Sequence, residues 1–110
     1  MRFHHTGVIT DQEQDGEVYV EETKVWVTNP DQNPYRIEFL RFEPDSPVLP
    51  PVRDRCHTAY VVDDIAAAIA GKRVLLGPFD ALEGLRVVFV EQDGAVIEYM
   101  QFSKGRTDIS

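Results

Sequence analysis

Residues 97–102 read Ile-Glu-Tyr-Met-Gln-Phe, and residues 37–42 read Ile-Glu-Phe-Leu-Arg-Phe. The two hexapeptides are identical or similar at every position except the fifth, where Arg41 corresponds to Gln101. Both are rich in β-branched and aromatic residues, a composition typical of strands. Because internal repeats determine architecture, this match is the first indication of the fold.

A second match precedes each hexapeptide. Residues 5–8 (His-Thr-Gly-Val) resemble residues 57–60 (His-Thr-Ala-Tyr). His5 therefore precedes Glu38 in one half of the chain as His57 precedes Glu98 in the other half. Two matched segments in the same order predict two related structural modules.

The length of 110 residues is that of a single domain, which we expect to span residues 1–110. Module one covers about residues 1–43, module two about residues 56–103, and a polar tail follows at 104–110. Residues 44–55 contain four prolines, which exclude helix and interior strand. This segment is predicted to be an extended linker between the modules.

Module two shows the clearer pattern of elements. We expect strands over residues 57–62, 73–76, 85–90 and 95–102, with a helix over residues 65–70. Asp63 or Asp64 can cap this helix, Gly71 ends it, and Gly77-Pro78 ends the short strand.

Module one has matching strands over residues 3–9, within 18–28, and over 35–42. A polar loop at residues 11–16 occupies the place of the helix. The fold class is therefore α+β, with two modules of the βαβββ type and the first helix reduced or missing.

Glu98 is a carboxylate on an otherwise apolar strand face. Because side chains alternate along a strand, Met100 shares its face, and a hairpin loop of even length adds residues from the preceding strand. The expected apolar cavity lining consists of Leu85, Val87, Phe89 and Met100. Glu38 lies among apolar residues in the same way, although Arg36 is on its face.

A buried, ionised carboxylate without a partner is unfavourable by several kcal/mol, on the order of its desolvation energy. Proton uptake, pairing of Glu38 with Arg36, or a shared cation would each neutralise the charge. The repeat places His5 and His57 on the opening strands. Two carboxylates and two neutral imidazoles around one divalent ion form a neutral site, and these N and O ligands suit zinc, nickel, iron or manganese. We therefore predict His5, Glu38, His57 and Glu98 as metal ligands.

We do not expect the other candidate polar residues, His4, Cys56 and the acidic segment 11–15, to form part of a site. His4 alternates to the strand face opposite His5, and Cys56 likewise faces away from His57 and lacks an activating base. The acidic segment 11–15 lacks the spacing of a calcium loop.

Composition narrows the classes of partner. The net charge of −8 disfavours nucleic acids and anionic membrane surfaces. One cysteine and no signal-like or membrane-length apolar segment predict a cytoplasmic protein.

These residues resemble the vicinal-oxygen-chelate superfamily, which includes glyoxalase I, methylmalonyl-CoA epimerase, extradiol dioxygenases and bleomycin-resistance proteins. The resemblance covers about residues 3–102, and residues 57–65 look like the family's opening strand and helix start. It implies two βαβββ modules paired in a curved half-open barrel around a metal. The order His5, Glu38, His57, Glu98 is closest to bacterial-type glyoxalase I. The chain is shorter than that enzyme, and no residues match its glutathione-binding positions.

The resemblance implies a metal-dependent isomerase, lyase or epimerase that acts on a small oxygenated substrate through a metal-stabilised enediolate. Glu98 is the expected catalytic base, with Glu38 as its partner. A non-catalytic small-molecule binding or resistance protein is the alternative. An iron-dependent dioxygenase is a second alternative, which Glu38 disfavours because such enzymes use two histidines and one glutamate.

The missing first helix leaves one face of module one uncovered. Tyr35, Ile37 and Phe39 lie on this face. Exposed apolar patches commonly form interfaces, so we expect a symmetric homodimer in which the first modules cover one another.

Overall fold

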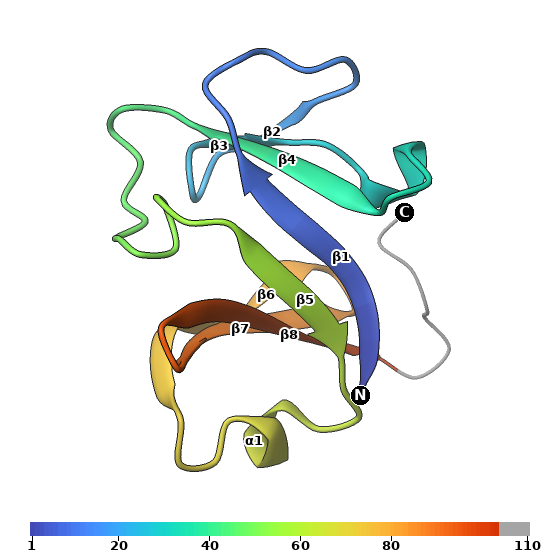
Figure 1. Cartoon of the computed structure of the whole chain (residues 1–110), viewed down its shortest axis with the longest axis vertical. Helices are drawn as coiled ribbons and strands as arrows, with labels where there is room; N and C mark the ends of the chain where they lie inside the picture. Colours follow the sequence, from blue (N-terminus) through green and yellow to red (C-terminus); the bar gives the residue numbers. More distant parts are fainter. Residues whose placement is uncertain (104–110) are drawn as a thin grey trace.

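The computed structural model describes residues 1–103, and the predicted polar tail at 104–110 lies outside the described residues. Strands of both modules form one curled sheet in the order β2-β3-β4-β1-β5-β8-β7-β6 (Figure 1). The strands are β1 (Arg2–Ile9), β2 (Val18–Val20), β3 (Val25–Val27), β4 (Ile37–Phe42), β5 (His57–Val61), β6 (Arg73–Leu82), β7 (Leu85–Gln92) and β8 (Ala95–Phe102).

The sequence repeat is also a structural repeat. The opening strand of each module pairs in parallel with its closing strand, β1 with β4 and β5 with β8. The registers correspond, because Gly7 is opposite Glu38 and Ala59 is opposite Glu98. The two opening strands pair antiparallel at the centre of the sheet. The predicted curved arrangement of two paired modules is therefore confirmed (Figure 1).

The hairpin that carries Glu98 has the expected even-length loop. Strands β7 and β8 are joined by Asp93 and Gly94, which both have positive φ, at 54° and 86°. Two consecutive left-handed residues form the turn whose twist matches a hairpin. The resulting register sets Phe89 opposite Glu98 and Val87 opposite Met100, as the sequence predicted.

The helices differ between the modules as expected. Module two contains α1 (Ile65–Ala68), where the Asp64 carboxylate accepts a hydrogen bond from the Ala66 N–H and so caps the helix. This single turn is shorter than the predicted helix at 65–70. In the described part of module one, the only helical segment is the 3₁₀ turn η1 (Pro30–Gln32).

Strand β6 corrects one prediction. It continues from Arg73 to Leu82 through Gly77-Pro78, where the sequence predicted its end. The strand is at the edge of the sheet, and its register with β7 shifts between Leu76 and Phe79. A proline is tolerated in such an irregular edge strand because its missing N–H removes no regular ladder bond.

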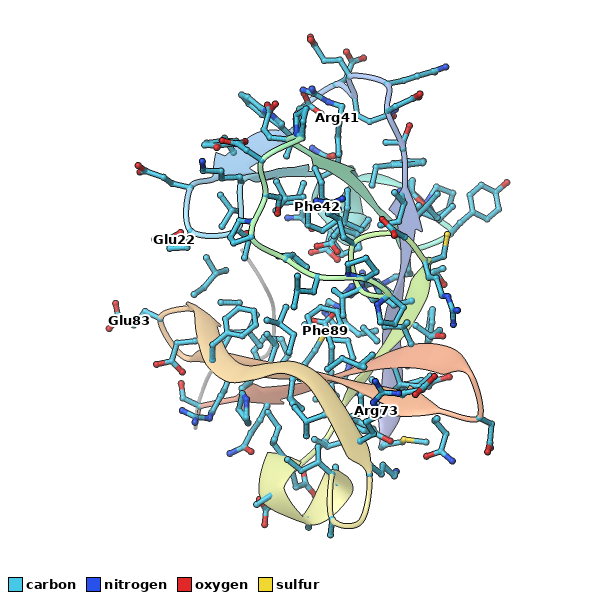
Figure 2. The ribbon with its side chains drawn as sticks, turned by 90° about the vertical axis from the view of Figure 1, so that its left-hand side faces the viewer. Glu22, Arg41, Phe42, Arg73, Glu83 and Phe89 are labelled. Atoms are coloured by element: carbon cyan, nitrogen blue, oxygen red, sulfur yellow. The ribbon has the colours of Figure 1, made fainter. Side chains whose placement is uncertain are left out.

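The proline-rich segment contributes residues to the hydrophobic core. Val48 and Val52 are buried and pack in one apolar cluster with the strand residues of module two. That cluster also contains Leu85, Val87, Phe89 and Met100, and Phe42 of module one packs against it. Figure 2 shows this segment crossing between the two halves of the curled sheet, near Phe42 and Phe89. The linker thus covers the inner face of the sheet.

No helix among residues 1–103 has the length and apolar character needed to cross a membrane.

Met100 is almost completely buried at the centre of the apolar cluster, at 1% exposure. We predict that Met100→Ala lowers the free energy of unfolding by about 2–5 kcal/mol, because it removes buried methylene groups and leaves a cavity. Urea denaturation measures this difference. The control Val18→Ala, at a position 64% exposed, should change the free energy by no more than about 0.5 kcal/mol. Equal effects of the two substitutions would contradict this description of the core.

Candidate metal centre

The four predicted ligands come from four adjacent strands. His5 and His57 lie on the central pair β1 and β5, while Glu38 and Glu98 lie on the flanking strands β4 and β8. In the antiparallel pairing, His5 is opposite Ala59 and His57 is opposite Gly7. The repeat therefore places the four side chains around the pseudo-two-fold axis that relates the two modules.

Gly7 makes room for His57. A Cβ atom at position 7 would lie 2.1 Å from Cε1 of the His57 ring, much closer than atoms can approach. Only glycine leaves this space, so the ring of His57 lies over the backbone of β1. The sequence contained this signal, since a small residue follows each repeated His-Thr pair.

The carboxylates approach both imidazoles. Nε2 of His5 lies 3.5 Å from Oε1 of Glu38 and 3.3 Å from Oε1 of Glu98. Nε2 of His57 lies 3.9 Å and 3.1 Å from the same two oxygens. His5, Glu38 and His57 each offer a ligand atom within 4.8 Å of the others, an arrangement that could hold a metal ion. Glu98 adjoins this set through its contacts with both histidines.

The imidazole nitrogens that face the carboxylates are not satisfied by hydrogen bonds. Nε2 of His5 and both ring nitrogens of His57 are buried and have no hydrogen-bond partner among residues 1–103. Their short distances to the carboxylates therefore lack the direction that a hydrogen bond requires. Buried polar atoms without partners are rare and call for a specific cause, such as an ion.

The distances fit a common ion. Ligand atoms held about 2.1 Å from one metal lie roughly 3.0 Å apart at right angles and roughly 3.4 Å apart in a tetrahedron. The four nitrogen–oxygen separations extend from 3.1 to 3.9 Å. The donor set of two imidazoles and two carboxylates also matches that of zinc and related divalent ions. His5, Glu38 and His57 therefore fit a metal of this kind, and Glu98 lies against both histidines.

The centre is enclosed by protein. His5, His57 and Glu98 are buried, whereas the Glu38 side chain keeps 16% exposure. The ring of His57 packs edge-on against Phe89, with centroids 5.1 Å apart. This apolar contact limits the movement of His57 and excludes water from one side of the centre.

Opposite charges shift the pKa values of His5 and Glu98 apart. Burial alone lowers the pKa of His5, but contacts with Glu38 and Glu98 outweigh it and raise the pKa to about 9. Burial likewise raises the pKa of Glu98, but contacts with His5 and His57 outweigh it and lower the pKa to about 2. Without a metal, a protonated His5 therefore forms an ion pair with the Glu98 carboxylate at neutral pH.

The side chain of His4 is not on the strand face that strict alternation of side chains predicted. The register between β1 and β5 shifts between Phe3 and His5, so His4 is an extra residue in the strand. It is buried, and its Nδ1 lies 2.8 Å from Nδ1 of His5. Burial, followed by the positive charges of His5 and Arg36, lowers the pKa of His4 to about 4. The interpretation of His4 as a residue directed away from His5 was therefore wrong.

Arg36 does not neutralise Glu38. Its guanidinium donates to a carboxylate oxygen of Asp31 and its Nε donates to the backbone carbonyl of His4, the latter at 2.8 Å. Among residues 1–103, its ion pair is with Asp31 and none is formed with Glu38. Pairing with Arg36, one alternative to a shared cation, is thereby excluded.

The four predicted cavity residues lie beside the centre and are buried. Leu85, Val87, Phe89 and Met100 form the apolar cluster described above. Two cavities of about 640 and 430 Å³ lie elsewhere, and neither is lined by these residues or by the four predicted ligands. Cys56 is exposed and takes no part in the centre.

Comparison with known proteins supports the fold. The fold resembles that of a hypothetical protein from Bacillus halodurans, with a TM-score of 0.67, 15% identity, and coverage of 97% of this chain and 98% of that chain. A glyoxalase family protein from Bacillus cereus aligns with a TM-score of 0.44 and 14% identity over 94% and 95% of the two chains. No protein-family model and no curated protein matches the sequence.

The decisive observation is the pairing of two equivalent four-stranded modules into one curled sheet. The curled sheet of paired modules is the half-open barrel that the sequence resemblance implied. In this sheet the candidate centre lies where the two modules meet, on strands β1, β4, β5 and β8.

The pKa shifts predict the pH dependence of the metal-free protein. The raised pKa of His5 stabilises the fold below pH 6.5, and this contribution is lost as pH rises to about 9. The lowered pKa of Glu98 stabilises the fold above pH 4.5, and this contribution is lost as pH falls to about 2. We therefore expect the pair to stabilise most between pH 4.5 and 6.5.

Urea denaturation in the presence of a chelator measures this profile. His5→Gln is the control variant, because it removes the titrating group while keeping a polar side chain. The stability of the original protein should fall more steeply than that of the variant between pH 6.5 and 9. Parallel curves for the two proteins would contradict the ion pair.

Proposed function

We propose that the protein binds one divalent metal ion through His5, Glu38, His57 and Glu98 and catalyses proton transfer on a small oxygenated substrate. The observation that carries this proposal is the set of unsatisfied nitrogens of His5 and His57 facing two carboxylates. An ion at their common focus would satisfy Nε2 of each histidine and cancel both negative charges. Zinc, nickel, iron and manganese all suit the ligand set.

The reaction class is that of a metal-dependent isomerase, lyase or epimerase of the glyoxalase kind. When bound, the metal supplies Lewis acidity toward an oxygen of the substrate. Glu98 acts as the base that takes a proton from the adjacent carbon, because it is the buried carboxylate opposite Phe89 on the apolar face. Glu38 is more exposed than Glu98, so it is the carboxylate nearer to solvent and serves as the partner in proton exchange.

The apolar residues beside Glu98 define the substrate side of the centre. Leu85, Val87, Phe89 and Met100 pack in one cluster with Val48 and Val52, and Phe89 contacts the ring of His57. The apolar surface excludes water and strengthens the electrostatic interactions of the centre.

Metal content and proton exchange together test the proposal. We expect about one metal ion per chain by elemental analysis of the untagged protein. With metal bound, the protein should exchange carbon-bound hydrogen for deuterium in a panel of α-hydroxyketones and α-ketoaldehyde–thiol adducts, as observed by NMR. Glu98→Gln should reduce the exchange rate by about 10²–10⁴-fold, because it removes the base.

Glu83→Gln is the matched control, because it makes the same substitution at an exposed turn (Figure 2). It should retain the original rate. Stoichiometric metal without exchange would favour a binding or resistance protein of the same fold. Oxygen consumption with an iron-loaded protein would favour a dioxygenase. Absence of metal binding contradicts the proposal altogether.

We further propose a cytoplasmic homodimer. The uncovered outer face of module one supports assembly, since Tyr35 is 75% exposed and Ile37 and Phe39 are partly exposed. In module two, α1 lies near the corresponding face of β8 (Figure 1). A second copy could cover the face that lacks this helix. The single cysteine agrees with a reducing compartment.

Light scattering at micromolar concentration tests the assembly. We expect the mass of a dimer for the original protein and a shift toward the monomer for Tyr35→Lys, because a charge would be buried in the interface. Leu49→Lys is the control, since Leu49 is equally exposed at 74% but lies in the linker. A monomeric original protein contradicts the dimer.

A further inference from the structure

His4 is a buried titratable residue that the proposed reaction does not use. It is 4% exposed, and it exists as an extra residue where the register of β1 and β5 shifts. Such bulges re-aim a side chain within a strand. Here the bulge brings the rings of His4 and His5 to 5.1 Å, at an angle of 80°.

The contact engages one nitrogen of His5. At 2.8 Å, the two Nδ1 atoms are within hydrogen-bond distance, and Nε2 of His5 is free to bind a metal when Nδ1–H of His5 donates to Nδ1 of His4. Nδ1 of His5 is therefore occupied, and the ring presents Nε2 alone toward Glu38 and Glu98. By contrast, Nδ1 of His57 has no hydrogen-bond partner among the described residues. Of the two histidines of the centre, only His5 therefore has a partner for its Nδ1 atom among the described residues.

His4 is itself held in place. Nε of Arg36 donates to the carbonyl oxygen of His4 at 2.8 Å, and another guanidinium nitrogen lies 3.3 Å from Nε2 of His4. The guanidinium also pairs with Asp31. Arg36 adopts a positive φ of 56°, a strained conformation for a residue other than glycine, and these contacts hold it there. The ring of Phe102 packs on the other side of His4.

We propose that His4 is a positioning residue that fixes the ring of His5, so that Nε2 of His5 points to the metal. The proposal rests on the proposed metal centre. Partners of the second nitrogen of a ligating histidine orient the ring, and their loss weakens metal binding about 10–100-fold. Arg36 and Asp31 connect this partner to the surface of module one, so the surface turn at η1 supports the centre.

Two substitutions separate positioning from packing. His4→Phe keeps a ring against Phe102 and removes the acceptor for Nδ1–H of His5, whereas His4→Asn keeps an acceptor oxygen near the position of Nδ1. We expect His4→Phe to weaken zinc affinity about 10–100-fold, measured by competition with a chromogenic chelator. His4→Asn should recover affinity to within about threefold of the original protein.

Imidazole ¹⁵N chemical shifts give a readout that packing alone does not change. In the original protein, zinc should shift Nε2 of His5 to a metal-bound value while Nδ1 keeps its hydrogen-bonded value, and His4→Phe should lose the latter. Equal zinc affinity of His4→Phe and the original protein overturns the inference, as does equal loss in both variants. Failure of the original protein to bind zinc instead overturns the proposed function on which the inference rests.

Discussion

The structure depends on how two carboxylates are accommodated inside an apolar sheet. Glu98 is directly opposite Phe89 and is buried with Met100. An isolated charge there would be unfavourable by several kcal/mol, on the order of its desolvation energy, so positive charge must reach it. The antiparallel pairing of β1 and β5 supplies it, because that pairing brings the histidines of both modules to the glutamates of both closing strands.

The same pairing explains why the chain keeps two modules. Each module alone provides one histidine and one glutamate, and the cluster of His5, Glu38 and His57 forms only where the modules meet, with Glu98 against both histidines. Gly7 and Ala59 are small because each lies opposite a histidine of the other module. The linker residues Val48 and Val52 then close the inner face beside the centre. Fold, linker and centre are therefore parts of one arrangement.

Much of this arrangement could be predicted from the sequence. The repeated Ile-Glu-aromatic segments fix the register of the closing strands, and Asp93-Gly94 fixes the hairpin, so the faces of Glu98 and Met100 follow from alternation alone. The bulge at His4 could not be predicted, because alternation fails wherever an extra residue enters a strand. The passage of β6 through Gly77-Pro78 was missed because edge position depends on the whole sheet. Burial of Val48 and Val52 depends likewise on how the sheet curls.

The most direct test of the central claim is a crystal structure of the metal-loaded protein with diffraction data collected at the absorption edge of the bound metal. We expect one anomalous peak within about 2.3 Å of Nε2 of His5, Nε2 of His57 and a carboxylate oxygen each of Glu38 and Glu98. A peak at another position, or four side chains that remain paired with one another without any peak between them, would contradict the claim.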